Sequence, residues 1–149
     1  MHIKTIQRAL TGVVVGTIGG PVVAGLAGFL MLSVTWLVLG LIQGWSSEEL
    51  AGIIPWAAVF GVLIAPIGAS AGAMVGLVIG AFDRWFGSSF NAGSFGGIIG
   101  SVIGLLVAPV LFGDTSELSP VVVAVLALAI AGVVVAVLVR LLVRRLGPT

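Results

Sequence analysis

The sequence predicts an all-α integral membrane protein with four transmembrane helices. Two observations carry this prediction. Apolar residues make up 60% of the 149 residues and charged residues only 7%, and the apolar residues form four long runs separated by short polar breaks. A soluble domain of this size has too little interior to bury so much apolar surface. We therefore expect a single membrane domain over residues 1–149, with lipid as its main solvent.

Each apolar run is long enough to cross a hydrocarbon core about 30 Å thick, which needs roughly 20 helical residues. The expected spans are 9–43, 53–82, 92–112 and 120–143. The breaks between them contain the charged and turn-forming residues that the runs lack. They are too short to form a soluble domain, and the absence of cysteine excludes disulfides and thiol chemistry.

The positions of the basic residues predict the orientation. In a four-span topology they all fall on one side of the membrane: Lys4, Arg8, Arg84, Arg140, Arg144 and Arg145. Cytoplasmic loops retain Lys and Arg, so we expect a multi-pass protein of a bacterial inner (plasma) membrane with both termini in the cytoplasm. A secretory signal peptide is the competing interpretation of the N-terminus, but its apolar region would run about 7–15 residues. Here the apolar run continues to Ile42, which favours a retained first span.

The first span is longer than a membrane requires. Its 35 residues would extend about 50 Å as a straight helix at 1.5 Å per residue. Gly19-Gly20-Pro21 lies inside it and predicts a bend or break, and Pro66 predicts a kink in the second span. We therefore expect the first two helices to be kinked at proline.

Glycine spacing is the most specific pattern in the chain. Most of the 23 glycines fall inside the spans, and many recur every four residues. This GxxxG spacing forms a groove along one helix face where another backbone can approach closely, which predicts glycine-zipper packing. The expected helix-packing residues are Gly12, Gly16, Gly20, Gly28, Gly68, Gly72, Gly76, Gly80, Gly96, Gly100 and Gly104.

A short motif also recurs, with glycine followed five residues later by proline. It occurs at Gly16–Pro21, Gly61–Pro66 and Gly104–Pro109. Repeats built around interrupted helices are typical of transporter binding sites near the midplane of the membrane. Chance matches are also common in sequence built from so few residue types, so both interpretations stay open.

Little catalytic chemistry is available. The spans lack a charged residue at their centres, and the only histidine is His2. These features argue against an enzyme, a metal site and a charge-coupled pathway. Hydroxyls inside the spans, among them Thr17, Ser70 and Ser101, are candidates for lining a pore or binding a ligand, although hydroxyls in apolar helices commonly bond to their own backbone.

The expected partners are membrane lipids and other transmembrane helices, with no nucleic acid. Arg140, Arg144 and Arg145, at the predicted cytoplasmic end of the fourth span, could bind anionic lipid headgroups or simply anchor the topology. No cofactor is evident from the residues. Apolar grooves alone suffice to hold a lipid, quinone or carotenoid, so the sequence leaves such a ligand open.

Two hypotheses of function follow. The first is a structural or assembly subunit, in a homo-oligomer or a larger membrane complex, that associates through glycine grooves exceeding what four helices need internally. The second is a small channel or transporter for a neutral or weakly polar solute, with Thr17, Ser70 and Ser101 around a cavity between kinked helices.

Overall fold

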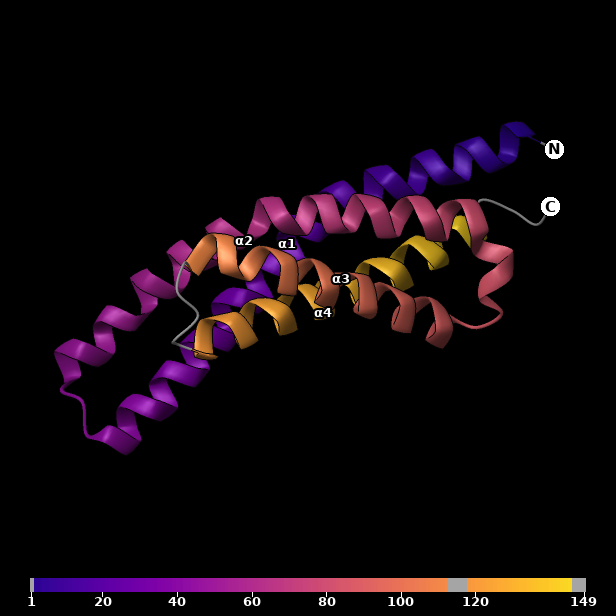
Figure 1. Ribbon diagram of the computed structural model, residues 1–149. Coiled ribbons are helices and arrows are strands. Elements are labelled where there is room, and N and C mark those ends of the chain that lie inside the picture. The colour runs from indigo at the N-terminus through magenta and orange to yellow at the C-terminus, as the bar shows by residue number, and fades with distance from the viewer. Residues whose placement is uncertain (1, 113–117, 146–149) are drawn as a thin grey trace.

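The chain folds into four long helices joined by short connections, as shown by a computed structural model that describes residues 2–112 and 118–145 (Figure 1). All regular structure in these residues is helical. The helices are α1 (His2–Gln43), α2 (Ser47–Phe82), α3 (Ser89–Phe112) and α4 (Leu118–Arg145), and a 3-10 turn, η1 (Asp83–Phe86), follows α2. Each long helix is apolar enough to cross a membrane. The predicted all-helical class is confirmed, and the four helices indicate a membrane location.

The turn between α1 and α2 contains specific start and stop signals. Gly44 has a φ of +72°, and the Trp45 amide donates to the Gly40 carbonyl at 2.9 Å. This geometry closes a helix C-terminus and favours glycine. Ser46 then caps α2: its amide donates to the Glu49 carboxylate at 2.7 Å, while the Glu49 amide donates to the Ser46 hydroxyl at 3.3 Å. The reciprocal pair satisfies two amides that the first turn leaves without helical partners.

The first two helices extend beyond the predicted spans. α1 starts at His2 rather than residue 9, and α2 starts at Ser47 rather than residue 53. Hydropathy marks only the apolar part of a helix, whereas capping sets where the helix begins. Both helices run without interruption through Pro21 and Pro66. The helix therefore does not break at Pro21, and a bend at either proline stays a prediction.

The helices are arranged as two hairpins. α1 and α2 make the most extensive contact, α3 and α4 the next, and α4 also packs against both α1 and α2. Contacts between α3 and α2 are few. α4 therefore connects the hairpins, and α3 is held mainly by α4.

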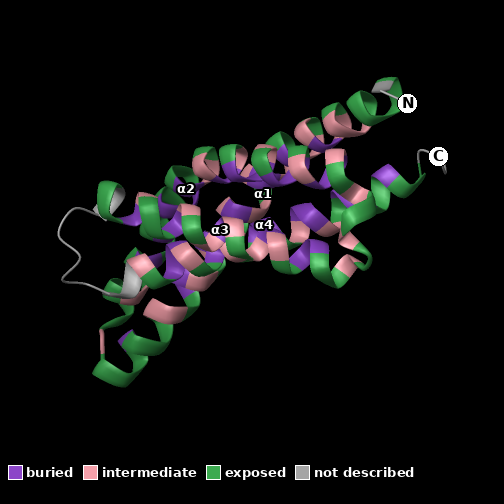
Figure 2. Cartoon of the chain, turned by 45° about the vertical axis from the view of Figure 1, so that its right-hand side comes forward, coloured by how far each residue is buried: buried purple, intermediate pink, exposed green. Residues whose placement is uncertain are grey.

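Buried side chains form two clusters along this bundle. One joins α1, α2 and α4 and includes Ala24, Leu32, Phe60 and Leu128. The other joins α2, α3 and α4 and includes Val75, Ile79, Ala92, Val135 and Val139. Figure 2 shows the buried residues on the facing sides of the helices, with exposed residues along the outer sides and ends. Both clusters use residues of α4, which accounts for its connecting position.

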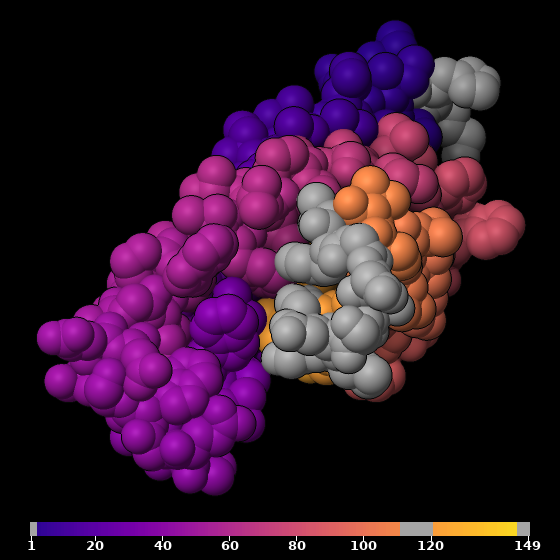
Figure 3. Space-filling view, turned by 60° about the vertical axis from the view of Figure 1, so that its left-hand side comes forward, coloured from indigo at the N-terminus to yellow at the C-terminus, as the bar shows by residue number. Residues whose placement is uncertain are grey.

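The α1–α2 hairpin is longer than its neighbours. α1 has 42 residues and α3 has 24, which correspond to about 63 Å and 36 Å at 1.5 Å per residue. The end of the hairpin projects past α3 and α4 (Figure 1), and its purple and magenta atoms stand away from the orange α3 in Figure 3. We call residues 37–56, which lie beyond the last α1 and α2 residues of the α1–α2–α4 cluster, the α1–α2 arm.

Candidate functional site

The glycine stripes of α1 and α2 face each other across an antiparallel interface. A β-carbon added at any of three α1 glycines would overlap the carbonyl of an α2 glycine, in the pairs Gly12 with Gly76, Gly16 with Gly72 and Gly20 with Gly68. The same overlap arises when the β-carbon is added on α2 at Gly72 or Gly76. The two backbones therefore approach more closely than any residue with a side chain would permit.

The second hairpin uses glycine in a similar way. A β-carbon at Gly96 would overlap the Gly132 carbonyl, and one at Gly100 would overlap the Leu128 carbonyl. A β-carbon at Gly104 would lie 2.8 Å from Cα of Val125. Each of these three α3 glycines thus meets the backbone of α4 directly.

Two predicted packing glycines have different neighbours. A β-carbon at Gly28 would lie 3.2 Å from the Phe60 ring, and one at Gly80 would overlap the backbone carbonyl of Arg8. All eleven predicted packing glycines are buried. We expected more glycine grooves than the four helices use among themselves, which would leave some for partner helices. The structure instead places the grooves against helices of the same chain.

Exchanging one glycine at the interface tests this packing. Gly72→Ala places a methyl group against the Gly16 backbone, so we expect the free energy of unfolding to fall by about 1–3 kcal/mol, a typical cost of overpacking. Gly52→Ala is the matched control in the same helix, because its added β-carbon meets nothing within 4 Å. We expect the control to be neutral or to stabilise by up to about 1 kcal/mol.

Reversible unfolding of the purified variants in detergent, followed by circular dichroism, measures the difference. Equal stability of the two variants would show that α1 and α2 do not approach closely at Gly72.

The three candidate pore hydroxyls do not converge. Each bonds to a carbonyl of its own helix: Thr17 to Val13 at 2.8 Å, Ser70 to Ile67 at 2.8 Å and Ser101 to Gly97 at 2.9 Å. The structure exposes Thr17 and Ser70 and half-buries Ser101. A hydroxyl that donates to its own helix needs no ligand to satisfy it.

A buried ion pair joins α4 to the end of α2, which sequence reasoning missed. Arg140 is 1% exposed, and its Nε lies 3.3 Å from Oδ1 of Asp83. Its Nη1 donates to the Phe86 carbonyl at 2.7 Å. The carboxylate compensates the charge of the buried guanidinium, although Nε and Oδ1 make no hydrogen bond to each other. The sequence predicts that Arg140 and Asp83 lie at the same end of the bundle, but contains no signal for the contact itself.

The other two arginines of this helix end are placed differently. Arg144 and Arg145 are both exposed on the last turn of α4. A role in binding lipid headgroups therefore stays a prediction for Arg144 and Arg145. The Arg140 side chain is buried and contacts Asp83 and Phe86 instead.

Removing one partner of the ion pair tests its contribution. Asp83→Ala removes the counter-ion of the buried Arg140 guanidinium and leaves its hydrogen bond to the Phe86 carbonyl. We therefore expect a loss of about 3 kcal/mol in the free energy of unfolding. Arg144→Gln, one turn further along the same helix and exposed, should change it by less than about 0.5 kcal/mol.

The double variant Asp83→Ala/Arg140→Leu removes the buried charge as well and should lose less than Asp83→Ala alone. Chemical denaturation in detergent measures all three variants. If Asp83→Ala and Arg144→Gln unfold at the same denaturant concentration, the ion pair between Arg140 and Asp83 contributes nothing to stability.

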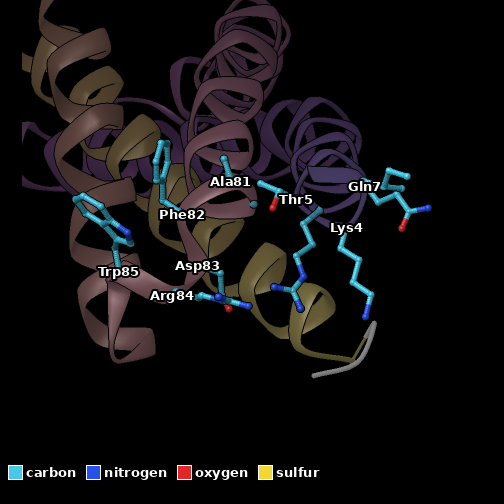
Figure 4. A pocket seen from close by; sticks show the side chains of 11 residues that line it. Lys4, Thr5, Gln7, Ala81, Phe82, Asp83, Arg84 and Trp85 are labelled. Carbon is cyan, nitrogen blue, oxygen red and sulfur yellow. The ribbon is translucent and has the colours of Figure 1, made fainter. Parts of the chain in front are cut away.

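The basic end of the bundle contains a cavity of about 760 Å³ between the start of α1 and the end of α2. Lys4 and Arg8 line it from α1, and Asp83 and Arg84 line it from η1. Figure 4 shows Lys4, Asp83 and Arg84 extending to the same side of the helices, with Phe82 and Trp85 on the flank away from Lys4. The lining carries three cations and one carboxylate, and that carboxylate is the partner of Arg140.

A smaller cavity lies at the opposite end, in the α1–α2 arm. It measures about 260 Å³ and is lined by three of the four tryptophans, Trp36, Trp45 and Trp56, together with Glu49. The Trp45 indole donates to the Gln43 side chain at 3.0 Å. Tryptophan favours the boundary between lipid and water, so we expect this cavity to lie near the headgroups in a membrane.

Comparison with known proteins identifies no relative. No family model matches the chain, and neither a curated protein nor a solved structure is significantly similar to it. Within residues 2–112 and 118–145, no group of three or more His, Cys, Asp or Glu side chains is arranged to hold a metal ion. The sites to explain are therefore the helix interfaces, the α1–α2 arm and the basic cavity.

Proposed function

We propose that the protein is a structural or assembly subunit that associates with other transmembrane helices through the α1–α2 arm, in a homo-oligomer or a larger membrane complex. The single observation that carries this proposal is the projecting apolar surface of the arm. Leu41 is 70% exposed, Ile42 76% and Trp56 67%. The end of the α1–α2 hairpin projects past both α3 and α4 (Figure 1).

The length of the apolar run supports a protein partner for this surface. α1 is free of charged residues from 9 to 43, which corresponds to about 50 Å of helix against a hydrocarbon core of about 30 Å. Tilting absorbs part of the excess, but a tilt of 40° still places only about 40 Å of helix inside the core. Cover by a neighbouring subunit is one way in which membrane proteins resolve such a mismatch.

In this proposal the glycines act indirectly. Glycine-zipper packing between α1 and α2 makes the hairpin stiff enough to hold the arm away from the bundle, and bends at Pro21 and Pro66 set its direction. The grooves themselves are filled within the chain, so the surface offered to a partner is the larger apolar side chains of the arm.

The proposed orientation follows the charges. The described basic residues gather at the end of the bundle where α1 starts and α4 ends, and Glu48 and Glu49 lie at the other. We place the basic end and both termini in the cytoplasm of a bacterial cell and the arm on the outer side.

Paired alanine substitutions test the role of the arm. We expect Leu41→Ala/Ile42→Ala to reduce the fraction of the protein found in a larger assembly by at least about tenfold, since truncating buried interface anchors typically costs more than 1 kcal/mol each. Leu105→Ala/Leu106→Ala on α3 is the matched control, because these leucines are 59% and 70% exposed and lie outside the arm.

The measurement is native electrophoresis of membranes extracted in a mild detergent, with the co-migrating chains identified by mass. An equal effect of both pairs, or a monomer in both, would contradict the proposal.

The channel or transporter hypothesis gains no support from the placement of its residues. Thr17 and Ser70 are exposed and bond to their own helices, so they do not surround a passage within one chain. It remains the alternative proposal, and solute flux into liposomes that contain the protein, compared with empty liposomes, tests it.

A further inference from the structure

We propose that the basic cavity binds the headgroup of an anionic phospholipid, with the phosphate held by Lys4 and Arg84, the exposed cations of its lining. This site is separate from the arm, so the proposal does not depend on the proposed assembly function. It rests on the charge of the cavity, its apolar wall and its position at the end of membrane-spanning helices.

The charge of the lining favours an anion. Lys4 and Arg8 approach from α1 and Arg84 from η1, so the cations come from two segments that lie far apart in the sequence. The one carboxylate of the lining, Asp83, has Oδ1 only 3.3 Å from Nε of Arg140, outside the cavity lining. The lining as a whole therefore carries more positive than negative charge, and its carboxylate already has a partner. Guanidinium and ammonium groups are the side chains that most often bind phosphate oxygens.

The apolar wall indicates that the anion is attached to hydrocarbon. Ile3, Phe82 and Trp85 line the same cavity, and the Phe82 and Trp85 rings pack edge to face at 5.9 Å between centroids. Trp85 is 85% exposed and Phe82 is 49% exposed. Figure 4 shows these rings beside the charged side chains rather than among them. A molecule that fills the cavity thus meets cations at one end and aromatic surface at the other, as a phospholipid would.

The size and position of the cavity fit the same ligand. At about 760 Å³ it lies within the range of roughly 300–1,000 Å³ usual for small-molecule sites. It is located where α1 begins and α2 ends, so in a membrane it is at the level of the headgroups. The positive-inside placement puts it in the cytoplasmic leaflet, where anionic lipids are concentrated.

Lipid retention by the full chain tests the proposal. The protein is purified in a mild nonionic detergent and mixed with either palmitoyl-oleoyl phosphatidylglycerol or palmitoyl-oleoyl phosphatidylcholine, and bound lipids are counted by native mass spectrometry. Lys4→Gln/Arg84→Gln removes two exposed cations of the cavity. Arg144→Gln/Arg145→Gln is the matched comparison, because it removes the same charge from the same end of the bundle outside the cavity lining. It also tests the competing prediction that these two arginines bind the headgroup.

We expect one phosphatidylglycerol to be retained in preference to phosphatidylcholine, and its apparent affinity to fall about fivefold for each cavity cation removed, while the comparison pair changes it less than twofold. Circular dichroism and gel filtration verify that both variants remain folded. Equal retention of the two lipids, or equal losses in the two variants, would overturn the proposal.

A third measurement distinguishes a bound lipid from a bound water-soluble phosphate compound. Glycerol 3-phosphate carries the same phosphate chemistry without acyl chains. We expect it to leave phosphatidylglycerol bound even at millimolar concentration, because it lacks the contacts with Phe82 and Trp85. Displacement of the lipid by glycerol 3-phosphate would assign the cavity to a water-soluble phosphate and overturn the lipid assignment.

Discussion

The structure depends on the close approach of the α1 and α2 backbones at their glycines. In lipid no hydrophobic force draws helices together, since hydrocarbon solvates an apolar helix as well as another helix does. Association then relies on dispersion between atoms in contact, which grows with the number of atoms that approach closely. The carbonyl of Gly72 next to Gly16 is such a contact. With β-carbons there, the helices would separate and lose these contacts along the interface.

A second constraint holds the remaining helices to this pair. α4 contributes residues to both buried clusters and contacts each of the other helices. Near its end Arg140 reaches Asp83 and the Phe86 carbonyl of η1. An ion pair needs two particular side chains to meet, whereas alanines and valines pack against many neighbours. The pair therefore favours the position of α4 at which Arg140 lies beside Asp83.

The number and type of helices could be predicted because hydropathy over about 20 residues is a local property of the chain. The burial of the glycine faces could also be predicted, since a four-residue spacing keeps Gly12, Gly16 and Gly20 on one side. Their partners could not, because the pairing of Gly16 with Gly72 depends on where the chain turns. Gly44 and the capping pair of Ser46 and Glu49 set that turn. The helix α2 begins six residues before the predicted span, because hydropathy does not register caps.

The contact between Arg140 and Asp83 also has a consequence for how the protein is made. Asp83 precedes Arg140 by 57 residues, so the carboxylate is synthesised before the arginine that pairs with it. An arginine entering the membrane edge alone would remain hydrated at the surface. With its carboxylate partner already waiting, the arginine can leave water as soon as α4 docks. A chain truncated before Arg140 would lack the guanidinium that pairs with Asp83.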